Sequence, residues 1–81
     1  MSNGINNNIY DTVRQNIKKY RQLKGITQQE LADLSYLSHG YIREIESTKM
    51  GTTFSLDAVE KIANGLEIEV KLLFEEQTEE K

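Results

Sequence analysis

The chain has 81 residues, of which ten are basic and thirteen acidic, so its net charge is −3. A chain of this length builds one domain around one core. The absence of cysteine excludes a disulfide framework and a thiolate zinc site. No apolar run approaches the roughly 18 residues that span a bilayer, and the first residues lack the pattern of a signal peptide, so we expect a cytoplasmic protein without a membrane partner.

The charges are distributed unevenly along the chain. Residues 1–49 contain seven basic and five acidic residues, whereas residues 50–81 contain three basic and eight acidic ones. An acidic total does not exclude binding to nucleic acid when the basic residues share one face.

The first predicted element is a helix that begins near Ile9 and ends at Gly25. Residues 1–8 contain four asparagines and one isoleucine, too little apolar surface to order the chain, and they predict a disordered tail. From Ile9 onward, apolar residues recur at steps of three and four, which is typical of one helical stripe: Ile9, Val13, Ile17, Tyr20 and Leu23. The basic residues are expected outside this stripe: Arg14, Lys18, Lys19 and Lys24.

Two short helices follow. Thr27 and Glu30 have the spacing of a capping box, which predicts a helix over residues 28–34 with Leu31, Ala32 and Leu34 as its apolar members. Ser38 is a second N-cap, and the helix after it extends to about Ser47. Two capped helices joined by a tight turn are typical of a helix-turn-helix, whose second helix enters a DNA major groove.

The remaining chain predicts a loop, a fourth helix and a C-terminal segment. Residues 47–54 are polar, and Ser55 caps a helix that reaches about Asn64 and stops at Gly65. The buried stripe of that helix is expected to contain Leu56, Val59, Ile62 and Ala63. Residues 66–74 fit both a short helix and a strand. The expected architecture is therefore all-α, a compact bundle of four to five helices over residues 9–75, followed by a charged tail at 76–81.

Residues 26–46, ITQQELADLSYLSHGYIREIE, resemble the helix-turn-helix of the lambda-repressor and Cro-like family, also called the xenobiotic-response-element family. The residues that carry the resemblance inside the motif are Thr27, Gln28, Glu30, Leu31, Ala32, Ile42, Ile45 and Glu46. Outside it, the apolar pattern of the family is matched by Ile17, Leu56, Val59, Ile62, Ala63, Leu66, Leu73 and Phe74, together with Arg21. The resemblance covers about sixty-five residues and implies a sequence-specific transcriptional regulator of double-stranded DNA.

The resemblance implies a role for each residue that matches the motif. Contacts to bases are expected from the second helix of the motif: His39, Gly40, Tyr41, Arg43 and Glu44. Contacts to phosphates are expected from helix starts and the following loop: Thr27, Gln28, Ser38 and Lys49. Arg21 and Glu46 are expected to form a partly buried ion pair.

Each of these roles has a plainer alternative. Arg43 can grip guanine O6 and N7 with its guanidinium fork, or it can contact a phosphate or a neighbouring acid. Tyr41 can lie against a sugar or a thymine methyl, or pack on the preceding helix. Glu44 can accept from cytosine or repel phosphate. Gln28 can be an ordinary solvated side chain.

The resemblance also implies a homodimer on a pseudo-palindromic operator. The interface is expected in the C-terminal segment, at Val70, Leu72 and Phe74, whether that segment is a helix or a strand. Three departures from the family pattern stand out. Gly40 inside the second helix of the motif weakens that helix and suggests a close approach of the backbone to DNA. Tyr36 occupies the turn position where the family usually has glycine, which predicts an unusual turn, and the loop over residues 47–54 is longer than usual.

Two other classes of function remain open. A protein-binding adaptor or an antitoxin-type module with the same fold is compatible with the net charge of −3 and with Glu44. An enzyme is disfavoured, because one histidine, no phosphate-binding glycine loop and no metal-spaced ligands leave no catalytic site. No cofactor, metal or small-molecule ligand is expected.

Overall fold

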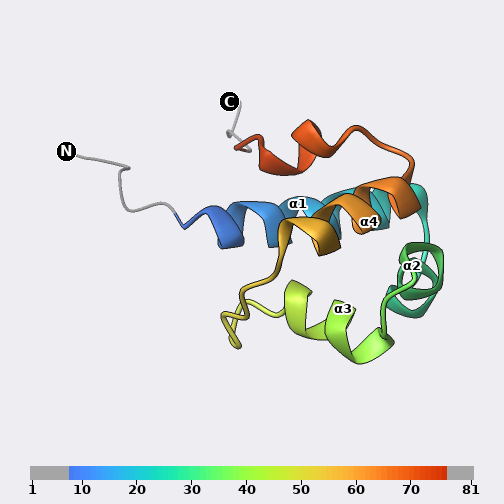
Figure 1. Ribbon diagram of the computed structural model, residues 1–81, viewed down its shortest axis with the longest axis horizontal. Helices are drawn as coiled ribbons and strands as arrows, with labels where there is room; N and C mark the ends of the chain where they lie inside the picture. Colours follow the sequence, from blue (N-terminus) through green and yellow to red (C-terminus); the bar gives the residue numbers. More distant parts are fainter. Residues whose placement is uncertain (1–7, 77–81) are drawn as a thin grey trace.

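The computed structural model describes residues 8–76, and these residues form five helical segments. They are α1 (Ile9–Lys24), α2 (Gln28–Ser35), α3 (His39–Glu46), α4 (Leu56–Leu66) and the 3₁₀ helix η1 (Val70–Phe74). In Figure 1, α1 and α4 cross the middle of the molecule, η1 lies on one side of them, and α3 lies on the opposite side with α2 at its end. No strand occurs among residues 8–76, which confirms the expected all-α architecture.

The predicted N-terminal and C-terminal tails lie largely outside the described residues. Asn8, assigned to the tail from its composition, is the N-cap of α1, and its side chain accepts a hydrogen bond from the backbone N–H of Tyr10 at 2.8 Å. Glu76, the first residue of the predicted charged tail, is exposed. Within the described range, no helix is long and apolar enough to cross a membrane.

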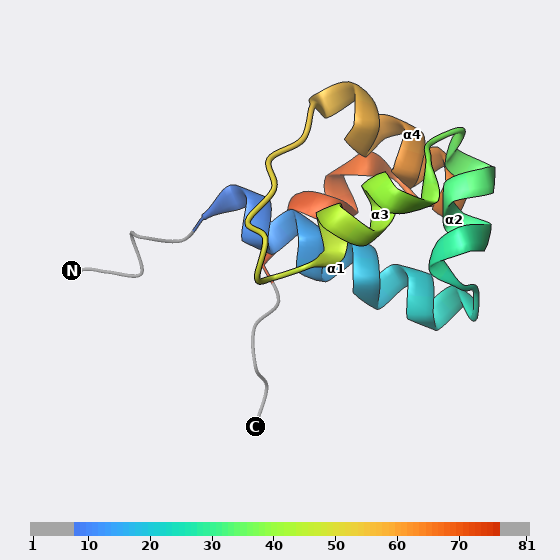
Figure 2. The same cartoon turned by 90° about the horizontal axis from the view of Figure 1, so that it is seen from below.

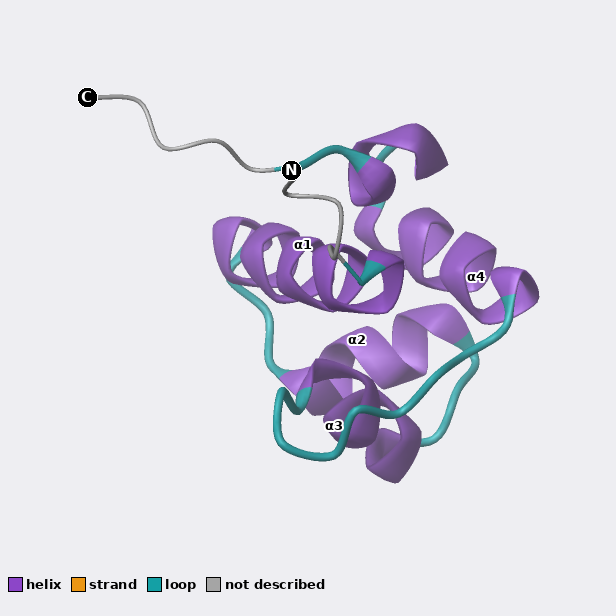
Figure 3. Cartoon of the chain, turned by 90° about the vertical axis from the view of Figure 1, so that its left-hand side faces the viewer, coloured by secondary structure: helices purple, strands orange, loops and turns teal. Residues whose placement is uncertain are grey.

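The core lies between α1, α2, α3 and α4 and is closed on one side by η1 (Figure 3). Its buried aliphatic residues are Val13, Ile17, Leu31, Ala32, Ile42, Ile45, Val59, Ile62, Ala63, Leu66 and Leu73. Because α2 and α3 have eight residues each, neither is long enough to be stable as an isolated helix. Their stability therefore depends on this shared core.

The apolar stripe predicted for α1 is correct at its centre and wrong at its ends. Val13 and Ile17 are buried, but Ile9 and Leu23 are exposed. Arg14, expected outside the stripe, is only 1% exposed. The reason is that α1 packs on α3 through polar groups as well as apolar ones, which a hydrophobic pattern does not reveal.

The turn between α2 and α3 is made by Tyr36 in the left-handed region, with φ 59° and ψ 38°. Its backbone N–H and that of Leu37 donate to Asp33 and Ala32 carbonyls, which caps the last turn of α2. The turn is therefore an ordinary left-handed C-cap and not the unusual turn expected. A tyrosine in this conformation costs about 1–2 kcal/mol relative to the right-handed region. Its side chain, 89% exposed, gives no packing in return.

Helix α4 contradicts two expectations from the sequence. Gly65 does not end the helix, which continues to Leu66 and is capped by Glu67 in the left-handed region. A Cβ at Gly65 would lie 2.6 Å from Ser35 Oγ and 3.2 Å from the Leu34 carbonyl carbon, so glycine here permits close packing of α4 on α2. Leu56, assigned to the buried stripe, is 74% exposed at the start of the helix.

A similar expectation was wrong in α2, where Leu34, predicted as an apolar member of the helix, is 48% exposed.

Glu67 also links the end of α4 to α1. Its carboxylate accepts a hydrogen bond from Lys24 Nζ at 2.9 Å. This hydrogen bond and the charge of Lys24 lower the pKa of Glu67 below its ordinary value.

The C-terminal segment is a 3₁₀ helix, so the choice between an α-helix and a strand is resolved in favour of a helical turn. Leu73 is buried, Leu72 and Phe74 are half-buried, and Val70 is exposed. Asn16 of α1 holds this segment in place, since its Nδ2 donates to the carbonyls of Leu73 at 2.8 Å and Glu75 at 2.7 Å. Asn16 is fully buried, and its Oδ1 has no hydrogen-bond partner.

Candidate nucleic-acid interface

The two helices of the motif begin at capped N-termini that leave backbone N–H groups available. Thr27 Oγ1 accepts from the N–H of Glu30 at 3.0 Å, and the Glu30 carboxylate accepts from the N–H of Thr27 at 2.8 Å. Ser38 Oγ accepts from the N–H of Tyr41 at 3.1 Å. These bonds satisfy only part of each first turn, and free N–H groups at a helix start attract anions. Both hydroxyls also keep a hydrogen that can be donated outward.

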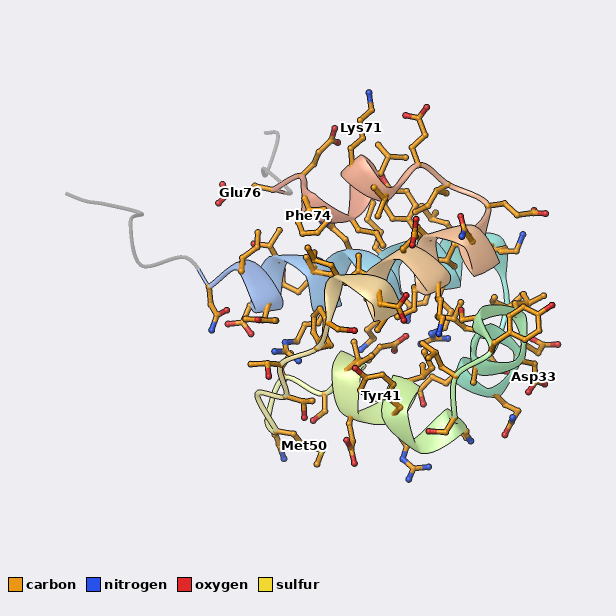
Figure 4. All side chains as sticks on the ribbon, viewed as in Figure 1. Asp33, Tyr41, Met50, Lys71, Phe74 and Glu76 are labelled. Carbon is orange, nitrogen blue, oxygen red and sulfur yellow. The ribbon has the colours of Figure 1, made fainter. Side chains whose placement is uncertain are left out.

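Helix α3 buries one face and exposes the other. Ile42, Ile45 and Glu46 are buried, whereas Arg43 and Glu44 are exposed and have no ion-pair partner among the described residues. Tyr41 is half-buried and packs in part against the core, and its place on α3 is labelled in Figure 4.

His39 and Gly40 are half-buried at the start of α3. A Cβ at Gly40 would meet nothing within 4 Å, so packing inside the protein does not require glycine there.

Glu46 connects three helices at the end of α3. Its side chain is 3% exposed and accepts from Arg21 Nε at 2.7 Å and Arg21 Nη2 at 3.0 Å, a bidentate pair. Arg21 Nη1 also donates to the Ile26 carbonyl at 2.9 Å. Gln28, at the first turn of α2, donates from Nε2 to Glu46 Oε1 at 3.0 Å. The Gln28 amide therefore holds α2 against α3 and still has one N–H hydrogen for another acceptor.

The loop between α3 and α4 carries Lys49, which is exposed and has no ion-pair partner in the described part of the chain. Met50, labelled in Figure 4, lies at the tip of this loop. Arg14 holds the loop from inside: its guanidinium donates to the carbonyls of Ile45 at 2.7 Å and Thr52 at 2.9 Å. This contact was missed from the sequence. The available signal was that Arg14 precedes Arg21 by about two helical turns, so both arginines share one face of α1.

A second exposed feature is apolar and lies at the start of α1, the start of α4 and η1. Two adjoining shallow grooves share Leu56, Val59 and Phe74; Ile9 lines one of them and Val70 the other. Ile9 is 51% exposed, Leu56 74% and Val70 42%. In Figure 4, Phe74 lies toward α1, whereas Lys71 points away from the body of the molecule. We refer to Ile9, Leu56, Val70 and Phe74 as the apolar face.

No group of three or more metal-ligating side chains comes together in the described range. The exposed part of α3 carries one guanidinium, Arg43, beside one carboxylate, Glu44, and the loop after it adds the ammonium group of Lys49.

Comparison with known proteins identifies the family. Residues 17–73 match the sequence pattern described as helix-turn-helix. The chain belongs to the helix-turn-helix family. None of the curated protein sequences matches it.

Solved structures resemble most of the chain. The restriction-modification controller protein C.AhdI from Aeromonas hydrophila is 32% identical, with a TM-score of 0.73 over 80% of this chain and 96% of that one. The controller protein C.Esp1396I, bound to a 25 base pair operator site, is 34% identical, with a TM-score of 0.74 over 84% and 87% of the two chains. The hypothetical transcription factor NHTF from Neisseria is 25% identical, with a TM-score of 0.77 over 85% and 77%.

The Arg21–Glu46 pair gives a prediction about stability. Arg21→Ala leaves the Glu46 carboxylate buried without its main partner, and we expect a loss of about 3–5 kcal/mol in the free energy of unfolding. Urea denaturation followed by circular dichroism measures the loss. Lys24→Ala, which removes the exposed contact with Glu67, is the matched control and is expected to cost far less. Equal losses in the two variants would show that the buried pair stabilises the fold no more than the exposed one does.

Proposed function

We propose that this chain is a transcriptional regulator that binds a pseudo-palindromic DNA operator as a homodimer and acts in the cytoplasm, without a catalytic step. The observation that carries the proposal is the position of α3. Its exposed residues are Arg43 and Glu44, in a fold shared with a controller protein bound to an operator site. A helix presented in this way fits the major groove.

Sequence recognition is assigned to the exposed part of α3. Arg43 has no ion-pair partner among residues 8–76 and can donate two parallel hydrogen bonds to guanine O6 and N7, worth about 1–3 kcal/mol of discrimination. Glu44 can accept from cytosine N4, and His39 and Tyr41 lie at the helix start, where base edges are reached first. Gly40 lets the backbone approach the DNA closely, since the protein itself leaves space for a side chain at that position.

Backbone contacts are assigned to the helix starts and to the loop. Thr27 and Ser38 can donate their hydroxyl hydrogens, and Gln28 its second amide hydrogen, to phosphate oxygens. Lys49 adds a positive charge from the loop. These contacts fix the position of α3 on the duplex without depending on sequence.

The homodimer is assigned to the apolar face. Its residues are more exposed than a core would leave them, and they line two adjoining grooves instead of being scattered singly over the surface. A second copy covering the same face gives a two-fold axis and two recognition helices about 34 Å apart, one turn of DNA. Val70 and Phe74 lie on this face, and half-buried Leu72 is assigned to its edge.

The test of the proposed function is selection of duplexes from a random library with the purified protein at two salt concentrations. We expect an enriched inverted repeat whose half-sites are about one helical turn apart, with affinity that falls steeply as salt rises. No enrichment at either salt would overturn the proposal and favour the protein-binding adaptor.

Gly40→Ala separates protein stability from DNA approach. Alanine adds helix propensity, and we expect the free energy of unfolding to rise by up to about 1 kcal/mol. We expect operator affinity to fall by about tenfold, or ~1.4 kcal/mol, because the new methyl group stands between backbone and DNA. Thermal melting and fluorescence anisotropy measure the two effects. An unchanged affinity would show that the DNA does not approach residue 40 closely.

Val70→Asp tests the dimer face. A charge in an apolar interface is expected to dissociate the dimer and weaken operator binding, while circular dichroism stays that of the folded protomer. Sedimentation velocity gives the oligomeric state. Lys71→Ala, on the same 3₁₀ helix but directed away from the body, is the control and should leave the dimer intact. A Val70→Asp protein that sediments like the wild type would remove η1 from the interface.

A further inference from the structure

We propose that a groove between α1 and the α3–α4 loop binds a DNA backbone phosphate through Lys18 and Lys49, with Arg14 as the residue that positions the loop. This inference rests on the proposed function and adds a contact surface on α1 to it. The groove has a volume of about 530 Å³. It is lined by Arg14, Gln15, Lys18, Lys19, Gln22, Glu46, Ser47, Thr48 and Lys49.

The charge of the groove favours an anion. Four of its lining residues are basic, and its acidic member, Glu46, is neutralised by the bidentate contact with Arg21. Lys18 and Lys49 are exposed on opposite walls, and neither has an ion-pair partner within residues 8–76. Lys19 differs, because its ammonium lies 5.3 Å from the centre of the Tyr20 ring. The two lysines of the proposed site therefore keep their charges available to a ligand.

Arg14 removes the main electrostatic obstacle to a phosphate at this place. The groove lies at the C-terminal end of α3, where unpaired carbonyls concentrate negative partial charge. Arg14 Nη1 donates to the Ile45 carbonyl at 2.7 Å and approaches that of Ser47 at 3.4 Å. The guanidinium, which is also paired with Asp11 at 3.0 Å, thus places a cation against the negative helix end.

The same guanidinium also determines where Lys49 stands. Its Nη2 donates to the Thr52 carbonyl at 2.9 Å, while Nη1 holds the end of α3, so the two ends of the loop are tied to one side chain with Lys49 between them. Asp11 accepts from Arg14 Nε at 3.0 Å, and the Phe54 ring lies 5.7 Å from the guanidinium carbon. Because Nε, Nη1 and Nη2 each donate to an acceptor within the protein, Arg14 serves as a positioning residue and not as a phosphate ligand.

The location of the groove matches the course of a DNA strand beside the recognition helix. A helix in the major groove is bordered on both sides by sugar-phosphate backbone. In Figure 2, the loop leaves the end of α3 and crosses the first half of α1. A strand that contacts Lys49 on this loop therefore passes the wall on which Lys18 stands.

The first experiment measures the salt dependence of binding for Lys18→Ala, by fluorescence anisotropy with the selected operator and with an unrelated duplex. We expect affinity for both duplexes to fall by a similar factor, and the slope of log K against log salt to decrease by about one. Lys61→Ala is the matched control: its side chain is on α4, half-exposed, and paired with Asp57. It should leave both quantities unchanged. A Lys18→Ala slope equal to that of the wild type would overturn the site.

The second experiment tests the positioning role with a double-mutant cycle between Arg14 and Lys49. Arg14→Lys keeps the charge and loses the fork, and Arg14→Gln loses both; circular dichroism and melting establish that each is folded before binding is measured. We expect Lys49→Ala to weaken binding in the wild-type background and to have much less effect beside either Arg14 variant. Additive effects would overturn the positioning role. A wild-type protein that binds no duplex would instead overturn the proposed function.

Discussion

The position of α3 depends on two arginines of α1 that lie about two helical turns apart on one face. Arg21 grips the Glu46 side chain with two hydrogen bonds, and Arg14 binds the backbone carbonyl of Ile45 and the loop beyond it. Both contacts are made at the C-terminal end of α3 and not at its first turn, where His39 and Gly40 are half-buried. The helix is therefore held at one end and presented at the other, as a reader of base edges has to be.

Charge is an expensive way to hold a small core together, because burial removes water from each ion. Here hydrogen bonds offset much of the desolvation energy, because the Glu46 carboxylate and the Arg14 guanidinium each have several hydrogen-bond partners. The apolar contacts between short helices do not by themselves specify an orientation, whereas a bidentate pair does. Such pairs give the α2–α3 unit a defined orientation on α1, although each of the two helices has only eight residues.

Local features of the fold could be predicted from the sequence, and long-range ones could not. The caps at Thr27, Ser38 and Ser55 and the left-handed residue at Gly25 were predicted because each depends on residues within a few positions. Gly65 was misassigned as a helix end because the reason for glycine lies across the molecule, at Ser35. Arg14 was misassigned for the same kind of reason, since the backbone carbonyls that accept from it are more than thirty residues away along the chain. Of the α3 residues expected to contact bases, Arg43 and Glu44 are exposed, whereas His39, Gly40 and Tyr41 are half-buried, and the DNA contacts of all five stay predictions.

The buried amide of Asn16 also fixes the C-terminal segment to α1. It binds the carbonyls of Leu73 and Glu75, so the helix that holds α3 on one side also holds η1 on the other. In a dimer formed through η1 and its neighbours, α1 is then a rigid spacer between the two-fold axis and each recognition helix. In the proposed dimer, the α1 anchors set the number of base pairs between operator half-sites, and α3 sets the identity of the bases. Two such proteins can share a half-site sequence and still select different operators, because the distance between half-sites is measured by a part of the chain that reads no base.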